Sequence, residues 1–553
     1  MLVSSFADGL YRRFILPLFF AVGVLLVSVT FAPLLLAKAG AAAVDVGQQT
    51  ITIALTQEPP NLDATQSTDT VSFFVLGHIN EGLVRYDRRG RIVPAVASDW
   101  VAGDQHIDFT LREDARWSDG TQLTAADFVY AWQLLMDPAT AAPYASIMLP
   151  IKNAGAISRG DLPPTALGVT ALSARQLRVE LERPCGYCIS LMAHASFFPI
   201  KQTFRETQGS RYGAEANSLL FNGPFTLSHW THGARLTLTR NPHYWDREGI
   251  TLTAINIDYI TEDNRARLNL FRDGSIALAS LGAETVADAA SQSMRLRTFV
   301  SGGLSYLRFN VGPTRLMSEV KLRRALSLVF DSNEFVNKVI GIPGYKPSIS
   351  FFPSWLPGAS GSFAEEHPPL KPMRDLALAR RLVEEVKQEL GGGDLPAITL
   401  LTVASPTGAK VAEYLQGLAA QHLGLSIKID QQTFKQYLAK AAQGDFDLAI
   451  SSWYPDFNDL VTYADLLASW NGNNRGYYNN PEYDKTLDIL LGSTDAQERM
   501  TAAARLQDII REDVPVIPMA ETGSAYLQHP KLRGVVRRVL GPDPDYSRAK
   551  VLP

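Results

Sequence analysis

Helix-like and strand-like patterns alternate between residues 376 and 450, and this alternation constrains the fold more than any other feature of the chain. Helical spacing of apolar residues and short strand-like runs occupy, in order, 376–390, 398–403, 409–423, 425–429, 434–442 and 448–450. Strands that alternate with helices in this way build a sheet with helices packed on its faces. The sequence therefore predicts an α/β fold.

The last of these strands leads into aromatic residues around one carboxylate. Pro455 has no N–H to donate and should end the strand, and Trp453, Tyr454 and Asp456 gather at its exit. Strand ends are where α/β sheets usually hold ligands, and an indole face beside a carboxylate suits an ammonium group. One interpretation is that Asp456 receives a cation. The other is a loop acid that caps its own turn, which the local residues alone favour.

The N-terminal segment predicts export across a membrane. A pair of arginines precedes an uncharged apolar stretch over 14–37, which as a helix would measure roughly 36 Å and could span a bilayer. Small residues at 37–39 and 41–43 fit cleavage by a signal peptidase, whereas no cysteine follows directly to accept a lipid. Residues 1–43 are therefore expected to be a signal peptide or a membrane anchor.

Length and charge favour a protein of several domains that binds small or peptide ligands. The 553 residues are 46% hydrophobic and 20% charged, enough to bury more than one core. A net charge of −4 without a long Lys/Arg run argues against nucleic acid as a partner. The chain has no Gly-x-Ser-x-Gly, His-Glu-x-x-His, phosphate-loop or dinucleotide motif. We therefore expect no catalytic residues, no metal and no cofactor.

Cys185 and Cys188 are the two cysteines of the chain. In an oxidising compartment they are candidates for a small local disulfide, and their spacing also occurs in dithiol oxidoreductases. Redox sites of that kind start a helix in a βαβ unit, whereas Pro184 and a strand-like run over 176–182 precede this pair. A structural pair is favoured. A membrane-anchored thiol oxidoreductase or chaperone is the alternative from another functional class.

Three local patterns give further structural expectations. Thr124 with Asp127 three residues on should cap a helix that ends before Pro138. Residues 50–55 alternate apolar and polar side chains, as a half-buried strand does. The stretch 342–372 is rich in Pro, Gly and Ser and is expected to be a long surface loop.

A set of motifs follows in order along nearly all of the chain after the signal. They are Asn80-Glu-Gly-Leu-Val, Arg116-Trp-Ser-Asp-Gly-Thr, Thr124-Ala-Ala-Asp-Phe-Val-Tyr-Ala-Trp, Asp137-Pro with Pro143-Tyr-Ala-Ser, Asn222-Gly-Pro-Phe-Thr-Leu, Arg240-Asn-Pro-His-Tyr-Trp, Arg323-Arg-Ala-Leu and Ser452-Trp-Tyr-Pro-Asp-Phe-Asn-Asp. In these motifs the chain resembles the periplasmic oligopeptide-binding proteins of ABC importers, extracellular solute-binding protein family 5.

The resemblance implies a fold and a domain plan. The fold is the α/β periplasmic binding protein of class II type, with two lobes closing on a central cleft and an inserted third lobe. In this chain lobe I is expected to comprise 44–80, 209–305 and 522–553, the inserted lobe II 81–208, and lobe III 306–521.

The resemblance also implies a function. An exported monomer would capture peptides in the cleft and deliver them to the permease subunits of an ABC transporter in the inner membrane. It would work in the periplasm, held at the inner membrane if the N-terminal segment stays uncut. Peptides in this family bind as an added strand through main-chain hydrogen bonds. A murein peptide or a nickel chelate is the alternative ligand.

Individual binding residues follow from the same resemblance. The family acid that holds the peptide α-ammonium corresponds to Asp456, its tryptophan to Trp453, and a ligand-facing tyrosine to Tyr144. The full expected ligand-binding set is Asp456, Trp453, Tyr144, Ser452, Tyr454 and Phe434.

Two positions depart from the family pattern. Ile450 stands where oligopeptide binders commonly place a basic residue for the peptide carboxylate, which leaves Lys440 as the nearest cation in the sequence. Tyr454 stands where the family has a cysteine. The sequence therefore does not identify the residue that binds the carboxyl end of the ligand.

Overall fold

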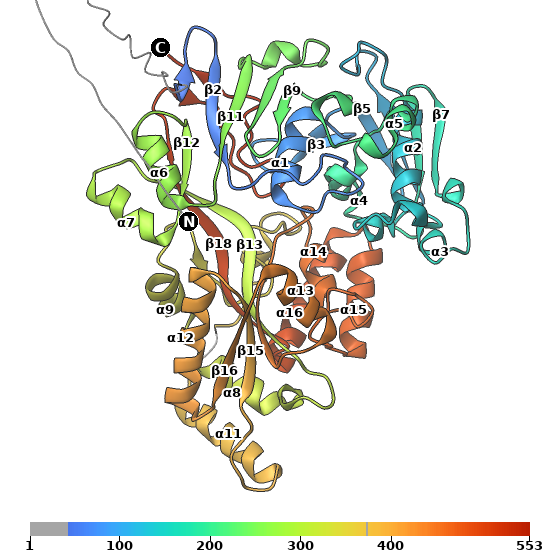
Figure 1. Ribbon diagram of the computed structural model, residues 1–553. Helices are drawn as coiled ribbons and strands as arrows, with labels where there is room; N and C mark the ends of the chain where they lie inside the picture. The colour runs from blue at the N-terminus through green and yellow to red at the C-terminus, as the bar shows by residue number, and fades with distance from the viewer. Residues whose placement is uncertain (1–41, 372–373) are drawn as a thin grey trace, which may run out of the picture. The chain divides into compact units, whose positions relative to one another are not determined.

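The computed structural model describes residues 42–371 and 374–553 (Figure 1). The expected signal peptide or membrane anchor lies outside these ranges up to residue 41. Within them, no helix combines the length and the apolar character needed to cross a bilayer.

A five-stranded sheet combines the start of the described chain with residues from its middle. Its order is β1 (Val44–Asp45), β2 (Thr50–Leu55), β11 (Ala254–Ile260), β10 (Arg235–Arg240) and β9 (Phe225–Thr231). The half-buried strand expected over 50–55 is buried more completely. Thr52 is 1% exposed because Ala43 and Ala277 are hydrogen-bonded to it on its outer side.

The residues of a four-stranded sheet lie between β2 and β9 in sequence. Its order is β5 (Ala97–Ala102), β6 (His106–Leu111), β8 (Gln176–Glu180) and β7 (Val169–Ser173). Helix α2 (Ala125–Met136) packs on it and buries Phe128 and Trp132 completely. The backbone N–H of Thr124 donates to Asp127 Oδ2 at 2.7 Å. This confirms the predicted helix start, and the helix ends before Pro138 as expected.

The largest sheet contains the predicted α/β alternation. Its order is β12 (Leu278–Leu281), β18 (Val516–Gln528), β13 (Arg297–Phe309), β17 (Leu448–Trp453), β15 (Ile398–Val403) and β16 (Ile427–Gln432), and β14 (Lys346–Pro347) pairs with β18. Strand β15 is parallel to β16 and β17. Helices α11 (Leu376–Glu389), α12 (Pro406–Leu423) and α13 (Phe434–Gln443) alternate with these strands, which confirms the α/β class.

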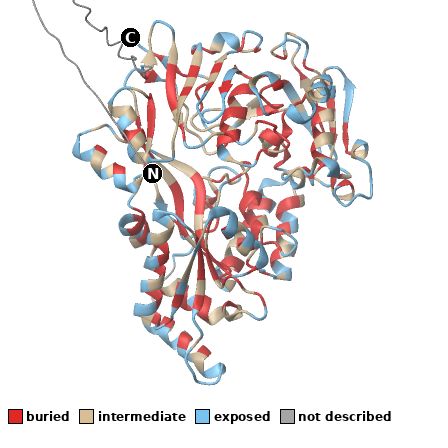
Figure 2. Cartoon of the chain, viewed as in Figure 1, coloured by how far each residue is buried: buried red, intermediate tan, exposed pale blue. Residues whose placement is uncertain are grey.

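Strands β13 and β18 are the longest of the sheet and run side by side (Figure 1). Both carry buried residues along most of their length (Figure 2). Their pairing shifts register between Val300 and Leu304. The lobe boundaries expected after residues 305 and 521 fall inside these two strands, and the lobe plan stays a prediction.

The expectation of a surface loop over 342–372 is wrong for its middle part. Phe351, Phe352, Leu356 and Phe363 are each at most 2% exposed. Aromatic rings hold this segment, since the Phe351 ring lies 5.2 Å from that of Tyr306 and 6.3 Å from that of Tyr463, edge-on in both cases. Pro353, Pro357 and Gly358 interrupt the run between these apolar residues, so the sequence carries no regular helix or strand pattern that marks them as core.

Candidate functional site

A cavity of about 1140 Å³ opens at the exit of β17. Its wall comes from segments that are far apart in sequence: α1 (Thr70–Ile79), the hairpin of β3 (Val84–Tyr86) and β4 (Ile92–Pro94), the loop after β17, and residues 534–548. All six expected ligand-binding residues line it: Tyr144, Phe434, Ser452, Trp453, Tyr454 and Asp456. The structure therefore brings the whole expected set to one cavity.

Asp456 is the acid of this cavity at the strand exit. Its backbone N–H donates to Thr462 Oγ1 at 3.1 Å, which fixes the turn after Pro455. Its carboxylate accepts one side-chain hydrogen bond within the described residues, a long one of 3.4 Å from the Tyr144 hydroxyl. Most of its acceptor capacity is therefore free for a ligand. Protein surrounds the group closely, and this burial raises the pKa of Asp456 to about 7.

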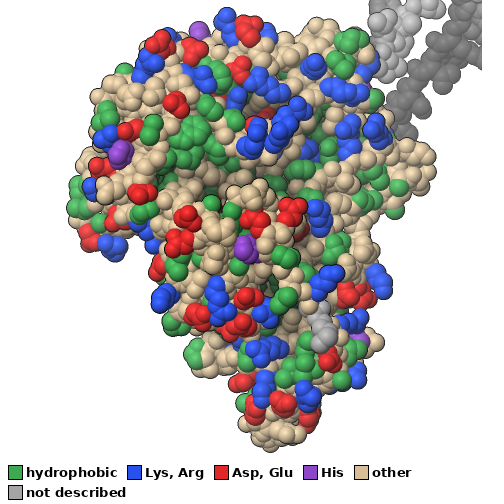
Figure 3. All heavy atoms as spheres, turned by 180° about the vertical axis from the view of Figure 1, so that it is seen from behind, with side chains coloured by type: hydrophobic (Ala, Val, Ile, Leu, Met, Phe, Trp, Pro, Cys, Tyr) green, Lys and Arg blue, Asp and Glu red, His purple; other side chains and the backbone are tan. Residues whose placement is uncertain are grey.

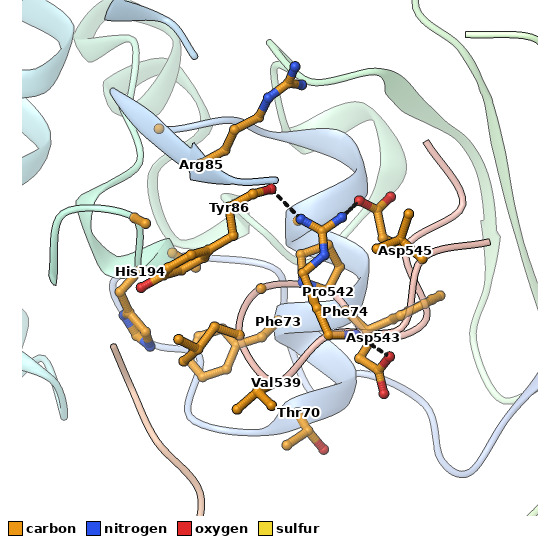
Figure 4. A pocket seen from close by; sticks show the side chains of 18 of the residues that line it. Thr70, Phe73, Phe74, Arg85, Tyr86, His194, Val539, Pro542, Asp543 and Asp545 are labelled. Carbon is orange, nitrogen blue, oxygen red and sulfur yellow. Dashed lines mark hydrogen bonds and ion pairs between the residues drawn. The ribbon is translucent and has the colours of Figure 1, made fainter. Parts of the chain in front are cut away.

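Aromatic rings form the wall beside Asp456. The His194 ring lies 5.0 Å from the rings of both Tyr144 and Phe73, and Figure 4 shows His194 and Phe73 together in the cavity. His194 Nδ1 accepts the Ser196 N–H at 3.2 Å, and burial lowers the pKa of His194 to about 4. The ring is thus neutral at neutral pH. No sequence motif marks Phe73 or His194 as site residues.

The other expected residues offer surfaces of different kinds. Trp453 is half-buried, and its indole N–H has no hydrogen-bond partner among the described residues. Ser452 and Tyr454 are exposed, and Phe434 is 62% exposed and stacks in parallel on Tyr437 at 6.5 Å. These faces suit contacts with apolar and backbone groups of a ligand.

Strand β17 has a free edge at the cavity. On one side Ser451, Ser452 and Trp453 pair with β13. On the other side β15 pairs with Leu448 and Ala449 and extends no further. Within residues 42–371 and 374–553, the last positions of β17 therefore have a strand partner on one side only, which suits a peptide bound as an added strand.

Basic side chains form a second part of the wall that no sequence motif indicates. They are Arg85, Arg88, Arg89, Arg91, Arg538 and Arg548. Four of them are paired with acids: Arg85 with Glu81, Arg91 with Asp87, Arg538 with Asp545, and Arg548 with Asp246. Among the described residues, Arg88 and Arg89 make no ion pair, and both are exposed.

Lys440 does not serve as the free cation that the sequence suggested. Its Nζ lies 2.9 Å from Asp430 and 2.7 Å from Asp445. Side-chain hydrogen bonds to these two acids raise the pKa of Lys440. Both partners are close in sequence, and the ammonium group of Lys440 is already paired with them in the ligand-free protein.

The loop after Asp456 is held by contacts with distant segments. Asp459 accepts two hydrogen bonds from the Arg499 guanidinium, at 2.7 and 2.8 Å, and both residues are buried. The Phe457 ring stacks on Tyr187 at 5.3 Å. The Asn458 N–H donates to Ser190 Oγ at 2.9 Å. These contacts position Asp456 at the cavity.

Cys185 and Cys188 form a disulfide. It closes the turn that carries Tyr187, whose ring packs on Phe457 beside the binding loop. Cys188 is 0% exposed and Cys185 is half-buried. The disulfide is therefore part of the packing around the site.

The buried carboxylate predicts a pH-dependent affinity. The pKa of Asp456 in the folded protein, about 7, lies above its value of 3.8 in an unfolded chain, so ionising it costs stability progressively as the pH rises from about 4 to about 7. An ammonium ligand needs the ionised form. Its affinity should therefore fall, by up to about tenfold per pH unit, as the pH drops from about 7 to about 5. Calorimetric titration across this range measures it.

Asp465 belongs in the same experiment. Burial and then the charge of Asp456 raise the pKa of Asp465 to about 7. In Asp456→Asn the pH dependence should disappear, whereas Asp465→Asn should keep it. A wild-type affinity that is constant below pH 7 would contradict an ammonium contact at Asp456.

Known proteins match this fold and the order of its segments. Residues 91–475 match the family model described as bacterial extracellular solute-binding proteins, family 5 Middle. The chain belongs to this family. It is 30% identical over 485 residues to the periplasmic murein peptide-binding protein MppA of Escherichia coli, covering 86% of this chain and 88% of that protein. It is also 30% identical over 469 residues to the periplasmic oligopeptide-binding protein OppA of Salmonella typhimurium, covering 82% and 83%.

Solved structures of peptide-binding proteins agree with the fold. The substrate-binding domain of an oligopeptide ABC transporter from Bacillus anthracis superposes with a TM-score of 0.78 at 32% identity, covering 92% of this chain and 99% of that one. The Escherichia coli murein tripeptide-binding protein MppA gives a TM-score of 0.78 at 29% identity, covering 92% and 99%. The periplasmic peptide-binding fold expected from the sequence is therefore confirmed.

Proposed function

We propose that this family 5 protein is exported, captures peptides in the cavity at the exit of β17, and delivers them to the permease of an ABC importer. One observation carries the ligand class: Asp456 presents a nearly unpaired carboxylate between Tyr144 and the free edge of β17. A carboxylate there can take the α-ammonium of a peptide, while the strand edge takes its main chain.

The surroundings of Asp456 support this assignment. The wall of Phe73, Tyr144 and His194 is aromatic and, at neutral pH, uncharged. Such a wall excludes water and strengthens the attraction between a carboxylate and an ammonium group. The face seen in Figure 3 carries basic and acidic side chains interspersed, without a continuous basic surface of the kind that binds nucleic acid.

The names of relatives support peptides as the ligand class. Several relatives that match over more than four-fifths of this chain are named as binding oligopeptides, dipeptides or murein peptide, whereas one is named as a probable deoxycholate-binding protein. A cell-wall peptide therefore lies within the proposal as a special case. Membership of the same family and the expected export segment support delivery to a membrane permease and residence in the periplasm as parts of the proposal.

Native mass spectrometry of the purified protein tests the ligand class. We expect the spectrum to contain a protein peak with one bound ligand, and fragmentation of the released ligand to give peptide ions. Refolded, ligand-free protein should then bind synthetic peptides with free amino ends in calorimetric titration. Absence of both a retained peptide and any heat of peptide binding would refute the proposal.

A further inference from the structure

Arg308 and Arg475 form a pair of neighbouring cations without an acidic partner. Arg308 lies on β13 and is 9% exposed, and its guanidinium donates one hydrogen bond, to the Tyr306 hydroxyl at 2.8 Å. A methyl group added at Gly476 would lie 3.4 Å from Arg308 Cγ, so the segment of Arg475 packs on the Arg308 side chain. Within residues 42–371 and 374–553 neither guanidinium forms an ion pair.

This arrangement costs free energy in the ligand-free protein. Burial, and then the charge of Arg308, lower the pKa of Arg475. Two guanidinium groups that are held together and partly shielded from water repel each other unless an anion neutralises them. The Tyr306 hydroxyl adds a donor beside the guanidinium groups, because it accepts a hydrogen bond from Arg308 and keeps its own O–H, whereas the Tyr437 hydroxyl donates to the Ile450 carbonyl oxygen at 3.0 Å. Guanidinium and hydroxyl groups together are donors for a carboxylate.

Two elements lead from the cavity to this cation pair. Strand β17 carries Trp453 in the cavity wall. Trp453 lies opposite Leu304 of β13, and four residues earlier on β17 Ala449 lies opposite Arg308. Side chains alternate along a strand, so Arg308 lies on the same sheet face as Leu304. Helix α13 carries Phe434 at the cavity, and Tyr437, one turn later, reaches Ser451.

We propose that Arg308 and Arg475 bind a carboxylate of the ligand at the end remote from Asp456. The inference rests on the proposed function and adds the group that meets the carboxyl end, which Ile450 does not provide. From Trp453 to Ala449 the strand rises about 13 Å, the reach of about four extended residues. The ligand is then a short peptide with a free carboxylate.

The exposed arginines of the β3–β4 hairpin are the competing cations. Arg88 and Arg89 line the cavity but are exposed to solvent. Exposed ion pairs contribute little because water and salt screen them. Arg308 is buried and Arg475 half-buried. A cation pair that is partly shielded from water and lacks a counter-charge gains more from an anion, which favours these two arginines.

Matched peptides test the carboxylate site. Alanine peptides of about three to five residues, each as free acid and as C-terminal amide, are titrated into the ligand-free protein. Wild type should bind the free acid at least about tenfold more tightly than the amide at one length. Arg308→Gln and Arg475→Gln should reduce this ratio to near one and leave the amide affinity unchanged. An amidated peptide ending in glutamate has a side-chain carboxylate but no terminal one, so its affinity shows which of the two carboxylates the arginines bind.

Control variants locate the effect. Lys440→Gln and the double variant Arg88→Gln, Arg89→Gln should both keep the wild-type ratio. Equal affinities for acid and amide in wild type would overturn the proposal, and so would a ratio that only the hairpin variants abolish.

Acetate separates this proposal from the proposed function. At equal ionic strength, sodium acetate should raise the unfolding temperature of wild type above that in sodium chloride, and the Arg308→Gln, Arg475→Gln double variant should lose this difference. If no alanine peptide binds but acetate still stabilises wild type, peptide binding fails and the carboxylate site stands. If neither acid preference nor acetate effect occurs, the carboxylate site fails.

Discussion

Replacing Asp456 with asparagine should weaken the binding of peptides with a free amino end by about ten- to a hundredfold. Asparagine keeps the size of the side chain and can still accept a hydrogen bond, but it loses the charge. The upper part of this range is expected because Asp456 is closely surrounded by protein and Tyr144 is its single side-chain partner among the described residues. Calorimetric titration of wild type and variant gives the ratio of dissociation constants.

An N-acetylated peptide of the same sequence is the chemical control. It lacks the ammonium group, so wild type and Asp456→Asn should bind it with nearly equal affinity. Asp465→Asn is the matched protein control, because Asp465 is a neighbouring acid with a similarly raised pKa that lies outside the cavity wall. It should keep the preference for free amino ends. Equal losses for free and acetylated peptides in Asp456→Asn would contradict an ammonium contact at this residue.

The class of fold and the strand that leads into the site could be predicted from local sequence. Pro455 marks the end of β17, and the regular spacing of apolar residues marks the helices and strands around it. Asp456 and Trp453 could be singled out because an acid and an indole at a strand exit are unusual neighbours. These predictions depend on residues that are close in sequence, whereas Tyr144, the side-chain partner of Asp456, lies 312 positions away in the chain.

The rest of the cavity depends on contacts between distant segments. Phe73 and His194 meet because α1 and the segment after α4 (Cys188–Leu191) are packed together, and nothing in either local sequence indicates this. Lys440 also looks free in sequence, but in space its ammonium group is paired with Asp430 and Asp445. Charge alone cannot show which cation remains available, because pairing is decided by the tertiary fold.

Breaking the ion pair between Arg499 and Asp459 should have the largest effect on stability. Arg499→Ala leaves the Asp459 carboxylate buried, at 6% exposure, without the two hydrogen bonds from the guanidinium and with only the Val461 N–H as a donor among the described residues. Removing one partner of a buried pair costs about 3 to 5 kcal/mol, because the remaining charge stays dehydrated. Denaturant-induced unfolding of the ligand-free protein measures the loss. Arg505→Ala, on the same helix α16 (Ala496–Asp513), removes an exposed pair with Glu482 and should leave the unfolding midpoint unchanged.

The same variant should weaken peptide binding, because Asp459 anchors the loop that presents Asp456. The guanidinium of Arg499 also lies over the Tyr187 ring, which stacks on Phe457, so its removal loosens both supports of the loop. The double variant Arg499→Met, Asp459→Leu replaces the charges with apolar side chains and should recover most of the lost stability. It should recover less of the affinity, since the two hydrogen bonds that fix the loop stay absent. If the double variant is as unstable as Arg499→Ala, the cost comes from lost packing of the arginine stem and not from a stranded carboxylate.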